Sequence, residues 1–272
     1  MVLDILLTVK LMEKFDYTKD DIVNSLNEAG ICKHDNLFIH SNIGFFGRLK
    51  DRNDANSYCD AFKAAILQVI GIEGTLVVPT FSYSFCNGQM FDRHKTRSVC
   101  GMFSEFIRQN PDSLRSDDAN FSISAIGKYA RYFTDNATSH SFGTNSFWER
   151  FLHHNGKLCR FNLDANYMTF LHYVEKLLNV SYRYDKIFKG KSIIDGCEVE
   201  KTFAHFVRDL NKTNTITDLT QFEKIARLRG LLKTANLGKG QILCISAKDA
   251  FDLIQSEVKK NPLFLIRGNM NF

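Results

Sequence analysis

Short apolar runs alternate along the chain with longer segments whose apolar residues recur at helical spacing. The runs predict strands at 36–40, 75–78, 122–126, 157–163, 240–245 and 263–266. The spacing predicts helices at 18–29, 54–70, 101–109, after Gly127, and at 146–153, 167–178, 204–210, 219–229 and 247–259. Strands and helices that alternate in this way are typical of an α/β fold.

The pattern changes in the C-terminal third of the chain. Three short strands are predicted at 181–188, 192–194 and 197–203, with turns at Gly190 and at Asp195-Gly196. Consecutive short strands joined by turns predict a small antiparallel patch. The chain has only three prolines and no repeat or linker-like tract, so we expect a single domain over residues 1–272.

Composition narrows the class of protein. The 272 residues are 44% hydrophobic and 24% charged, which is typical of a globular protein. The net charge of +5 is too small to predict nucleic-acid binding and favours anionic ligands. No apolar run reaches the roughly 18 residues of a membrane span. The apolar stretch Leu3–Leu7 is too short for a signal peptide, so we expect a cytoplasmic protein with its seven cysteines free.

Candidate ligand-binding residues follow the first two predicted strands. His40 and Ser41 lead into a loop punctuated by Gly44 and Gly47, whose backbone N–H groups could hold a phosphate. Thr80–Tyr83 follow the second strand, and ligands of open α/β sheets bind at such carboxyl ends. An ordinary turn with a satisfied histidine explains the first segment equally well, and a surface loop explains the second better when it is taken alone.

Two further segments combine charge with polar groups. Arg115-Ser116 and Asp117-Asp118 could position a phosphate or an amine, and Arg183 or Lys186 could face an anionic ligand. A solvated loop and exposed strand charges are the alternative interpretations.

The segment Asn166–Glu175 carries the strongest candidate for proton transfer. Thr169, His172 and Glu175 are spaced i, i+3 and i+6 on a predicted helix, so His172 and Glu175 are neighbours. A carboxylate beside an imidazole fixes its tautomer and raises its basicity. Spacing alone also allows a purely structural pair.

Several segments, taken together and in order along the chain, resemble the aminoglycoside 3-N-acetyltransferase family. They are residues 40–47, 73–81, 96–101, 115–116, 122–127, 141–146, 156–157 and 166–175. The resemblance implies a three-layer α/β/α sandwich with a mixed central sheet, acetyl-CoA or another acyl-CoA as donor, and an amine as acceptor. It implies coenzyme contacts at His40, Ser41, Ile43, Gly44, Gly47, Thr80, Phe81, Ser82, Arg115 and Ser116. It implies acceptor contacts at Tyr83, Asp117, Asp118, Asn166, Thr169 and Arg183, with His172 as base and Glu175 as its orienting partner. No metal is expected, because the adjacent His153 and His154, the best partners for a site with His140, point to different faces of a helix.

The sequence departs from the family at two places. Asp118-Ala119 stands where the family usually has His-Pro, and Phe147-Trp148 replaces a small step that often contains proline. Acceptor contacts near Asp118 are therefore expected to differ.

The expected reaction is direct acyl transfer in a ternary complex, with Thr80 or a nearby backbone N–H as the oxyanion donor. The positive charge favours an anionic acceptor, such as a nucleotide-linked amino sugar used for surface polysaccharide. An aminoglycoside acceptor is the first alternative, and a non-catalytic coenzyme A-binding protein is the second. A thiol hydrolase using Cys159 or Cys86 is a third. A homodimer is also allowed for.

Overall fold

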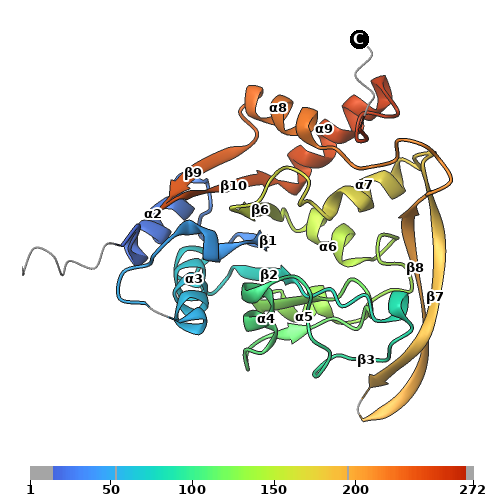
Figure 1. The fold of residues 1–272 in the computed structure, drawn as a ribbon, viewed down its shortest axis with the longest axis horizontal. Coiled ribbons are helices and arrows are strands. Elements are labelled where there is room, and N and C mark those ends of the chain that lie inside the picture. Colours follow the sequence, from blue (N-terminus) through green and yellow to red (C-terminus); the bar gives the residue numbers. More distant parts are fainter. Residues whose placement is uncertain (1–14, 53, 195, 268–272) are drawn as a thin grey trace, which may run out of the picture.

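A mixed sheet forms the centre of the protein, for which a computed structural model describes residues 15–52, 54–194 and 196–267 (Figure 1). In these residues its seven strands lie in the order β4-β5-β2-β1-β6-β10-β9. Their bounds are β1 Asn36–Ser41, β2 Thr75–Pro79, β4 Leu114–Arg115, β5 Ile123–Gly127, β6 Lys157–Phe161, β9 Lys233–Leu237 and β10 Gly240–Ser246. Strand β1 is parallel to both β2 and β6, whereas the outer pairs are antiparallel.

Helices cover both faces of this sheet, which confirms the expected three-layer α/β/α sandwich. One face carries α2 Lys19–Glu28, α3 Ala55–Ile70 and α4 Met102–Arg108. The other carries α5 Ala130–Thr134, α6 Phe147–His153, α7 Phe170–Leu177, α8 Thr220–Leu228 and α9 Ala247–Lys260. Because side chains alternate along a strand, Leu37 and Ile39 of β1 enter the first core and Phe38 enters the second.

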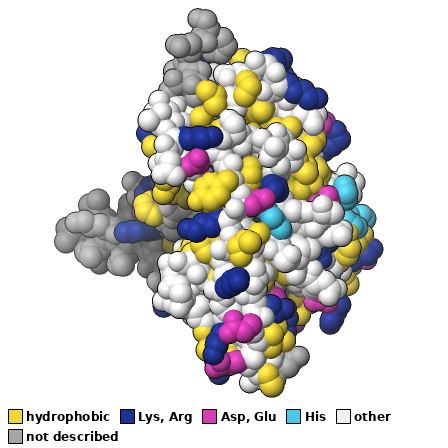
Figure 2. Space-filling view, turned by 90° about the vertical axis from the view of Figure 1, so that its right-hand side faces the viewer, with side chains coloured by type: hydrophobic (Ala, Val, Ile, Leu, Met, Phe, Trp, Pro, Cys, Tyr) yellow, Lys and Arg dark blue, Asp and Glu magenta, His cyan; other side chains and the backbone are white. Residues whose placement is uncertain are grey.

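The antiparallel patch is larger than the sequence predicts. Strands β7 Arg183–Ile194 and β8 Cys197–Arg208 pair over their whole length, and β3 Phe91–Asp92 adds a third strand beside β7. This hairpin curves along one side of the molecule (Figure 1). Figure 2 looks onto that side, where basic, acidic and apolar side chains are interspersed.

Several predicted elements need correction. Gly190 lies inside β7 and makes no turn, while Asp195 lies outside the described residues, as does the Leu3–Leu7 stretch. The predicted helix at 204–210 is wrong, because β8 continues to Arg208 and pairs with β7, burying His205. The predicted strand at 263–266 is reduced to one bridge between Ile266 and Thr217.

Local capping explains why the correctly predicted helices begin where they do. Thr18 and Asp54 both form capping boxes, and Ser146 and Ser246 accept from the backbone three residues on. Two short 3₁₀ turns, Ile43–Phe46 and Phe85–Asn87, follow β1 and precede β3. None of the described helices is long and apolar enough to cross a bilayer. The single domain over 1–272 stays a prediction.

Candidate active site

A cavity of about 510 Å³ lies where the parallel strands of the central sheet end. His40 and Ser41 close β1, Phe81 and Tyr83 follow β2, and Leu163 follows β6. The chain continues from β1 to α3 on one face of the sheet and from β6 to α7 on the other face. Connections that leave neighbouring strands towards opposite faces open a crevice between them, and this is where α/β folds bind ligands.

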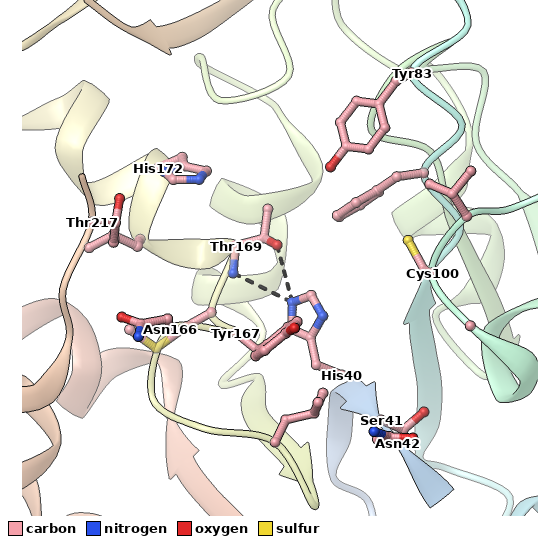
Figure 3. Close-up of a pocket in the computed structure, with 16 residues that line it drawn as sticks. His40, Ser41, Asn42, Tyr83, Cys100, Asn166, Tyr167, Thr169, His172 and Thr217 are labelled. Carbon is pink, nitrogen blue, oxygen red and sulfur yellow. Dashed lines mark hydrogen bonds between the residues drawn. The ribbon is translucent and has the colours of Figure 1, made fainter. Parts of the chain in front are cut away.

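Helix α7 places the predicted acid–base pair at this cavity. His172 lines the cavity, and its Nδ1 lies 2.8 Å from Oε2 of Glu175, three residues along the helix. Figure 3 shows the His172 ring directed into the open space. Because Nδ1–H donates to the carboxylate, Nε2 keeps its lone pair and can accept a proton.

Glu175 is fully buried and held by three groups. Tyr182 donates its hydroxyl to Oε1 at 3.0 Å, and Arg183 Nε lies 2.7 Å from Oε2. Burial would raise the pKa of Glu175, but the hydrogen bond from His172 and the Arg183 charge outweigh it and lower that pKa. Burial and the Arg183 charge lower the pKa of His172, partly offset by Glu175. The pair at neutral pH is therefore a carboxylate and an uncharged imidazole.

The opposite wall is formed by the end of β1. His40 lies on the same face of the strand as Phe38, so its ring turns towards α7. Its Nε2 lies 3.1 Å from Oγ1 of Thr169 and 3.5 Å from the Thr169 backbone nitrogen (Figure 3). Thr169 precedes α7, and its carbonyl accepts from the backbone N–H of His172. One residue thus connects both histidines.

Seven predicted site residues line the cavity together: His40, Ser41, Phe81, Tyr83, Asn166, Thr169 and His172. Glu175 supports His172 from behind. Gly44 and Gly47 lie in the loop after β1 and Asp117 pairs with Arg93 at 3.3 Å, so their predicted ligand contacts stay predictions.

The other predicted coenzyme contacts are buried and do not line this cavity, and their roles stay predictions. Arg115 donates to the carbonyls of Arg93, Thr96 and Thr80 and to Ser122, and its guanidinium lies over the Phe91 ring. It ties loops together and does not line the cavity. Ile43 belongs to the core, and the hydroxyls of Thr80, Ser82 and Ser116 bond to neighbouring protein groups.

Two predicted acceptor contacts also have internal roles. Asp118 accepts from the backbone of Asn120 and Phe121 and from the Ser141 hydroxyl, so it closes a buried loop. Arg183 pairs with Glu175 and donates to the Phe206 carbonyl and to Thr217. Neither side chain lines the cavity, so the departure from the family at Asp118 is accommodated inside the fold.

Sequence reasoning missed nine lining residues: Asn42, Val99, Cys100, Gly101, Leu163, Tyr167, Met168, Leu171 and Thr217. Tyr167, Met168 and Leu171 lie within the segment already singled out around His172, so they could have been found. Thr217 arrives from the connection between β8 and α8, and nothing in its local sequence indicates the cavity.

The cysteines do not support the thiol hydrolase alternative. Cys159 is buried, and Cys86 does not line the cavity. Cys100 does line it, but burial raises the pKa of its thiol to about 11, so the thiol stays protonated at neutral pH. His140 Nε2 lies 2.9 Å from Oδ1 of Asp185.

Comparison with known sequences places the chain in a family. The family model described as aminoglycoside 3-N-acetyltransferase matches residues 38–259. An aminoglycoside N(3)-acetyltransferase III from Salmonella sp is 24% identical over 183 residues, covering 60% of this chain and 62% of the relative. One from Enterobacter cloacae is 23% identical over the same shares. The match thus spans less than two thirds of these relatives.

Solved structures of similar fold cover most of the chain. Aminoglycoside acetyltransferase AAC(3)-Xa superposes with a TM-score of 0.78 at 18% identity, over 89% of this chain and 93% of that one. AAC-IIIb, in a binary structure with CoASH, gives 0.76 at 19% identity over 89% and 97%. These likenesses establish the shared fold. Together with the family match over residues 38–259, they show that the chain belongs to the aminoglycoside 3-N-acetyltransferase family.

Proposed function

We propose that this protein transfers an acetyl group from acetyl-CoA to an amine of an amino sugar, in a ternary complex at the cavity between β1 and α7. The observation that carries the proposal is His172, an uncharged imidazole with a free Nε2, held by Glu175 against a cavity at the sheet's crevice. Membership of an acetyltransferase family supports it.

The cavity wall suits an acyl-CoA co-substrate. Ser41 Oγ is buried at this wall with no hydrogen-bond partner in the described part of the chain. An amide of the pantetheine arm supplies such a partner. Gly101, with φ of 94°, leaves the wall free of a side chain opposite Ser41. The co-substrate brings an already activated acyl thioester, so the protein's main tasks are positioning and proton transfer.

His172 performs the proton transfer. The attacking amine must lose a proton, and Nε2 accepts it while Glu175 stabilises the imidazolium that forms. Arg183 and Tyr182 keep Glu175 from turning away. Phe142 packs edge-on against the His172 ring, with 5.6 Å between ring centroids, and limits its movement.

The acceptor is proposed to be an aminoglycoside amine first, because the relatives named above act on aminoglycosides and AAC-VIa has been solved bound to sisomicin. The sequence favoured an anionic acceptor partly because of Arg115 and Arg183, and both are directed away from the cavity. No Asp, Glu, Lys or Arg lines the cavity within the described ranges. The reacting part of the acceptor is therefore a largely uncharged sugar ring whose amine gives its proton to His172.

The test is release of free thiol from acetyl-CoA with a panel of amines. Sisomicin-type aminoglycosides should accelerate release and yield an acetylated product by mass spectrometry. The contrast is a nucleotide-linked amino sugar of the kind used for surface polysaccharide. If only that compound is acetylated, the aminoglycoside assignment is wrong and acyl transfer stands. If no amine is acetylated although coenzyme A stabilises the fold, the protein is a binding protein. A homodimer and a cytoplasmic location stay predictions.

A further inference from the structure

The hydrogen bonds of His40 determine which of its ring nitrogens carries a proton. Nε2 is the acceptor for the Thr169 backbone N–H at 3.5 Å and lies 3.1 Å from the Thr169 hydroxyl. A backbone N–H can only donate, so Nε2 must present its lone pair. The hydroxyl then shares this acceptor as a second donor.

The ring is also uncharged. Burial and the nearby charge of Arg160 lower the pKa of His40 to about 3. Arg160 reaches this place from β6 and pairs with Glu223 at 2.7 Å. The ring also packs against the Phe38 and Phe81 rings, at centroid distances of 5.1 and 6.5 Å. A neutral imidazole whose Nε2 accepts must carry its proton on Nδ1.

That Nδ1–H is directed into the cavity. Figure 3 shows the second ring nitrogen of His40 facing the space between the ring and Cys100. Among residues 15–52, 54–194 and 196–267, no group is hydrogen-bonded to it. The fold therefore holds one neutral N–H donor ready at the wall opposite His172.

Three backbone donors at the same wall are already engaged, whereas, among the described residues, the Ser41 hydroxyl is not. The backbone N–H groups of Asn42, Val99 and Cys100 donate to Phe161, Phe81 and Ser98. Thr80, the oxyanion donor expected from the sequence, is fully buried and its hydroxyl lies within hydrogen-bonding distance of those of Ser122 and Ser124.

We infer that His40 is a catalytic residue whose Nδ1–H stabilises the negative charge that develops on the acyl oxygen, while His172 removes the amine proton. This inference rests on the proposed acyl transfer. A donor placed in advance against the developing oxyanion is among the largest contributions to such reactions. Thr169 and Arg160 are positioning residues, because they hold the tautomer and the charge state of His40.

The step balances as follows. The amine nitrogen forms a bond to the thioester carbon, and the C=O electron pair moves onto oxygen, where the His40 N–H binds it. His172 Nε2 takes the ammonium proton. As the C=O bond re-forms, the C–S bond breaks, and the proton on His172 passes to the departing thiolate. The products are an amide and coenzyme A with a free thiol.

The first experiment reads the tautomer without any reaction. Long-range ¹H–¹⁵N correlation spectra of the ¹⁵N-histidine-labelled full chain should show a neutral Nδ1–H ring that does not titrate between pH 5 and 9. The His40→Asn spectrum assigns the signal by its loss. An Nε2–H tautomer, or titration near pH 6.5, would overturn the inference, even if acyl transfer itself is confirmed.

The second experiment uses amides that imitate one ring nitrogen each. In His40→Asn the amide nitrogen takes the place of Nδ1, whereas in His40→Gln it takes the place of Nε2. We expect His40→Asn to keep kcat within about tenfold, and His40→Gln and His40→Ala to lose roughly 10²–10³-fold. KM for acetyl-CoA should stay within about threefold, and the acid limb of the pH profile should not move.

Equal kcat for the Asn and Gln variants, or wild-type kcat in the Ala variant, would contradict the role of His40. If the Ala variant fails to fold, the Asn and Gln pair alone decides. A wild-type protein that acetylates no amine would refute the proposed function instead. The tautomer measurement would still test the hydrogen bonding of His40 independently of activity.

Discussion

The two histidines of the cavity have opposite hydrogen-bonding arrangements. His172, on α7, donates from Nδ1 to the Glu175 carboxylate and leaves a free lone pair on Nε2. His40, at the end of β1, accepts at Nε2 from Thr169 and leaves a free N–H on Nδ1. A carboxylate partner can only accept and a backbone N–H can only donate, so the partner selects the tautomer. The same side chain thus becomes a base on one wall and a donor on the other.

Removing the proposed base, His172, should have the largest effect on kcat. His172→Ala should lower kcat by roughly 10²–10⁴-fold, with part of the loss recovered at high pH as the free acceptor amine loses its own proton. Thiol release measured from pH 6 to 9 checks this. His153→Ala, at an exposed histidine outside the cavity, is the matched control and should retain full activity. Near-normal turnover of His172→Ala at every pH would refute the assignment.

Neutralising the Glu175 carboxylate should remove the partner that imposes the His172 tautomer. Glu175→Gln should cost about 10²-fold in kcat, because the imidazolium loses its counterion and the tautomer is no longer imposed. It should also lower the free energy of unfolding by about 3 kcal/mol, since Arg183 is left buried without its partner. Steady-state kinetics and urea denaturation measure the two effects. Glu198→Gln, on the exposed part of the hairpin, should change neither.

The charge state of His40 should affect the free energy of unfolding at acid pH. Its folded pKa of about 3 lies below the unfolded value of 6.5, so the unfolded chain binds the proton first. The stabilisation is full above pH 6.5 and declines towards pH 3, by at most about 1.4 kcal/mol per pH unit. The free energy of unfolding, measured by urea denaturation between pH 4 and 7, should therefore depend less steeply on pH in His40→Asn than in the wild type. An unchanged pH dependence of the free energy of unfolding would mean that His40 does not resist protonation.

Changes to Thr169, which positions His40, should have a smaller effect on kcat. Thr169→Val removes the hydroxyl and keeps the backbone N–H, so the His40 tautomer persists and kcat should fall less than about tenfold. Thr169→Ser restores the hydroxyl and should be near wild type. A loss in Thr169→Val as large as in His40→Ala would show that the hydroxyl, and not the N–H of His40, is the essential donor.

The smallest effect is expected from the cavity thiol. Cys100→Ala should keep kcat within about threefold, because a thiol with a pKa of about 11 supplies no thiolate at neutral pH. An inactive but folded Cys100→Ala variant would revive a covalent mechanism. Thermal unfolding of the variant is the control for folding.

Much of the scaffold could be predicted because its causes are local. Thr18 and Asp54 cap helices at the predicted places, and the runs at β1 and β2 are apolar enough to be buried strands. The long hairpin could not be predicted from local pattern. Residues 204–208 are acceptable in a helix, but pairing of β8 with β7 over twelve positions outweighs that preference.

The amino-acid sequence by itself determined the layered α/β architecture, the i, i+3 pairing of His172 with Glu175, and the family, because these depend on periodicity and on ordered motifs. Only the tertiary structure decided which polar residues face the cavity. Arg115 and Asp118 look like ligand contacts in the sequence, yet both satisfy buried backbone groups. The roles of His40 and Arg183 depend on partners 129 and 8 residues away. Such partners meet only when the sheet and its helices assemble, so local sequence carries no trace of them.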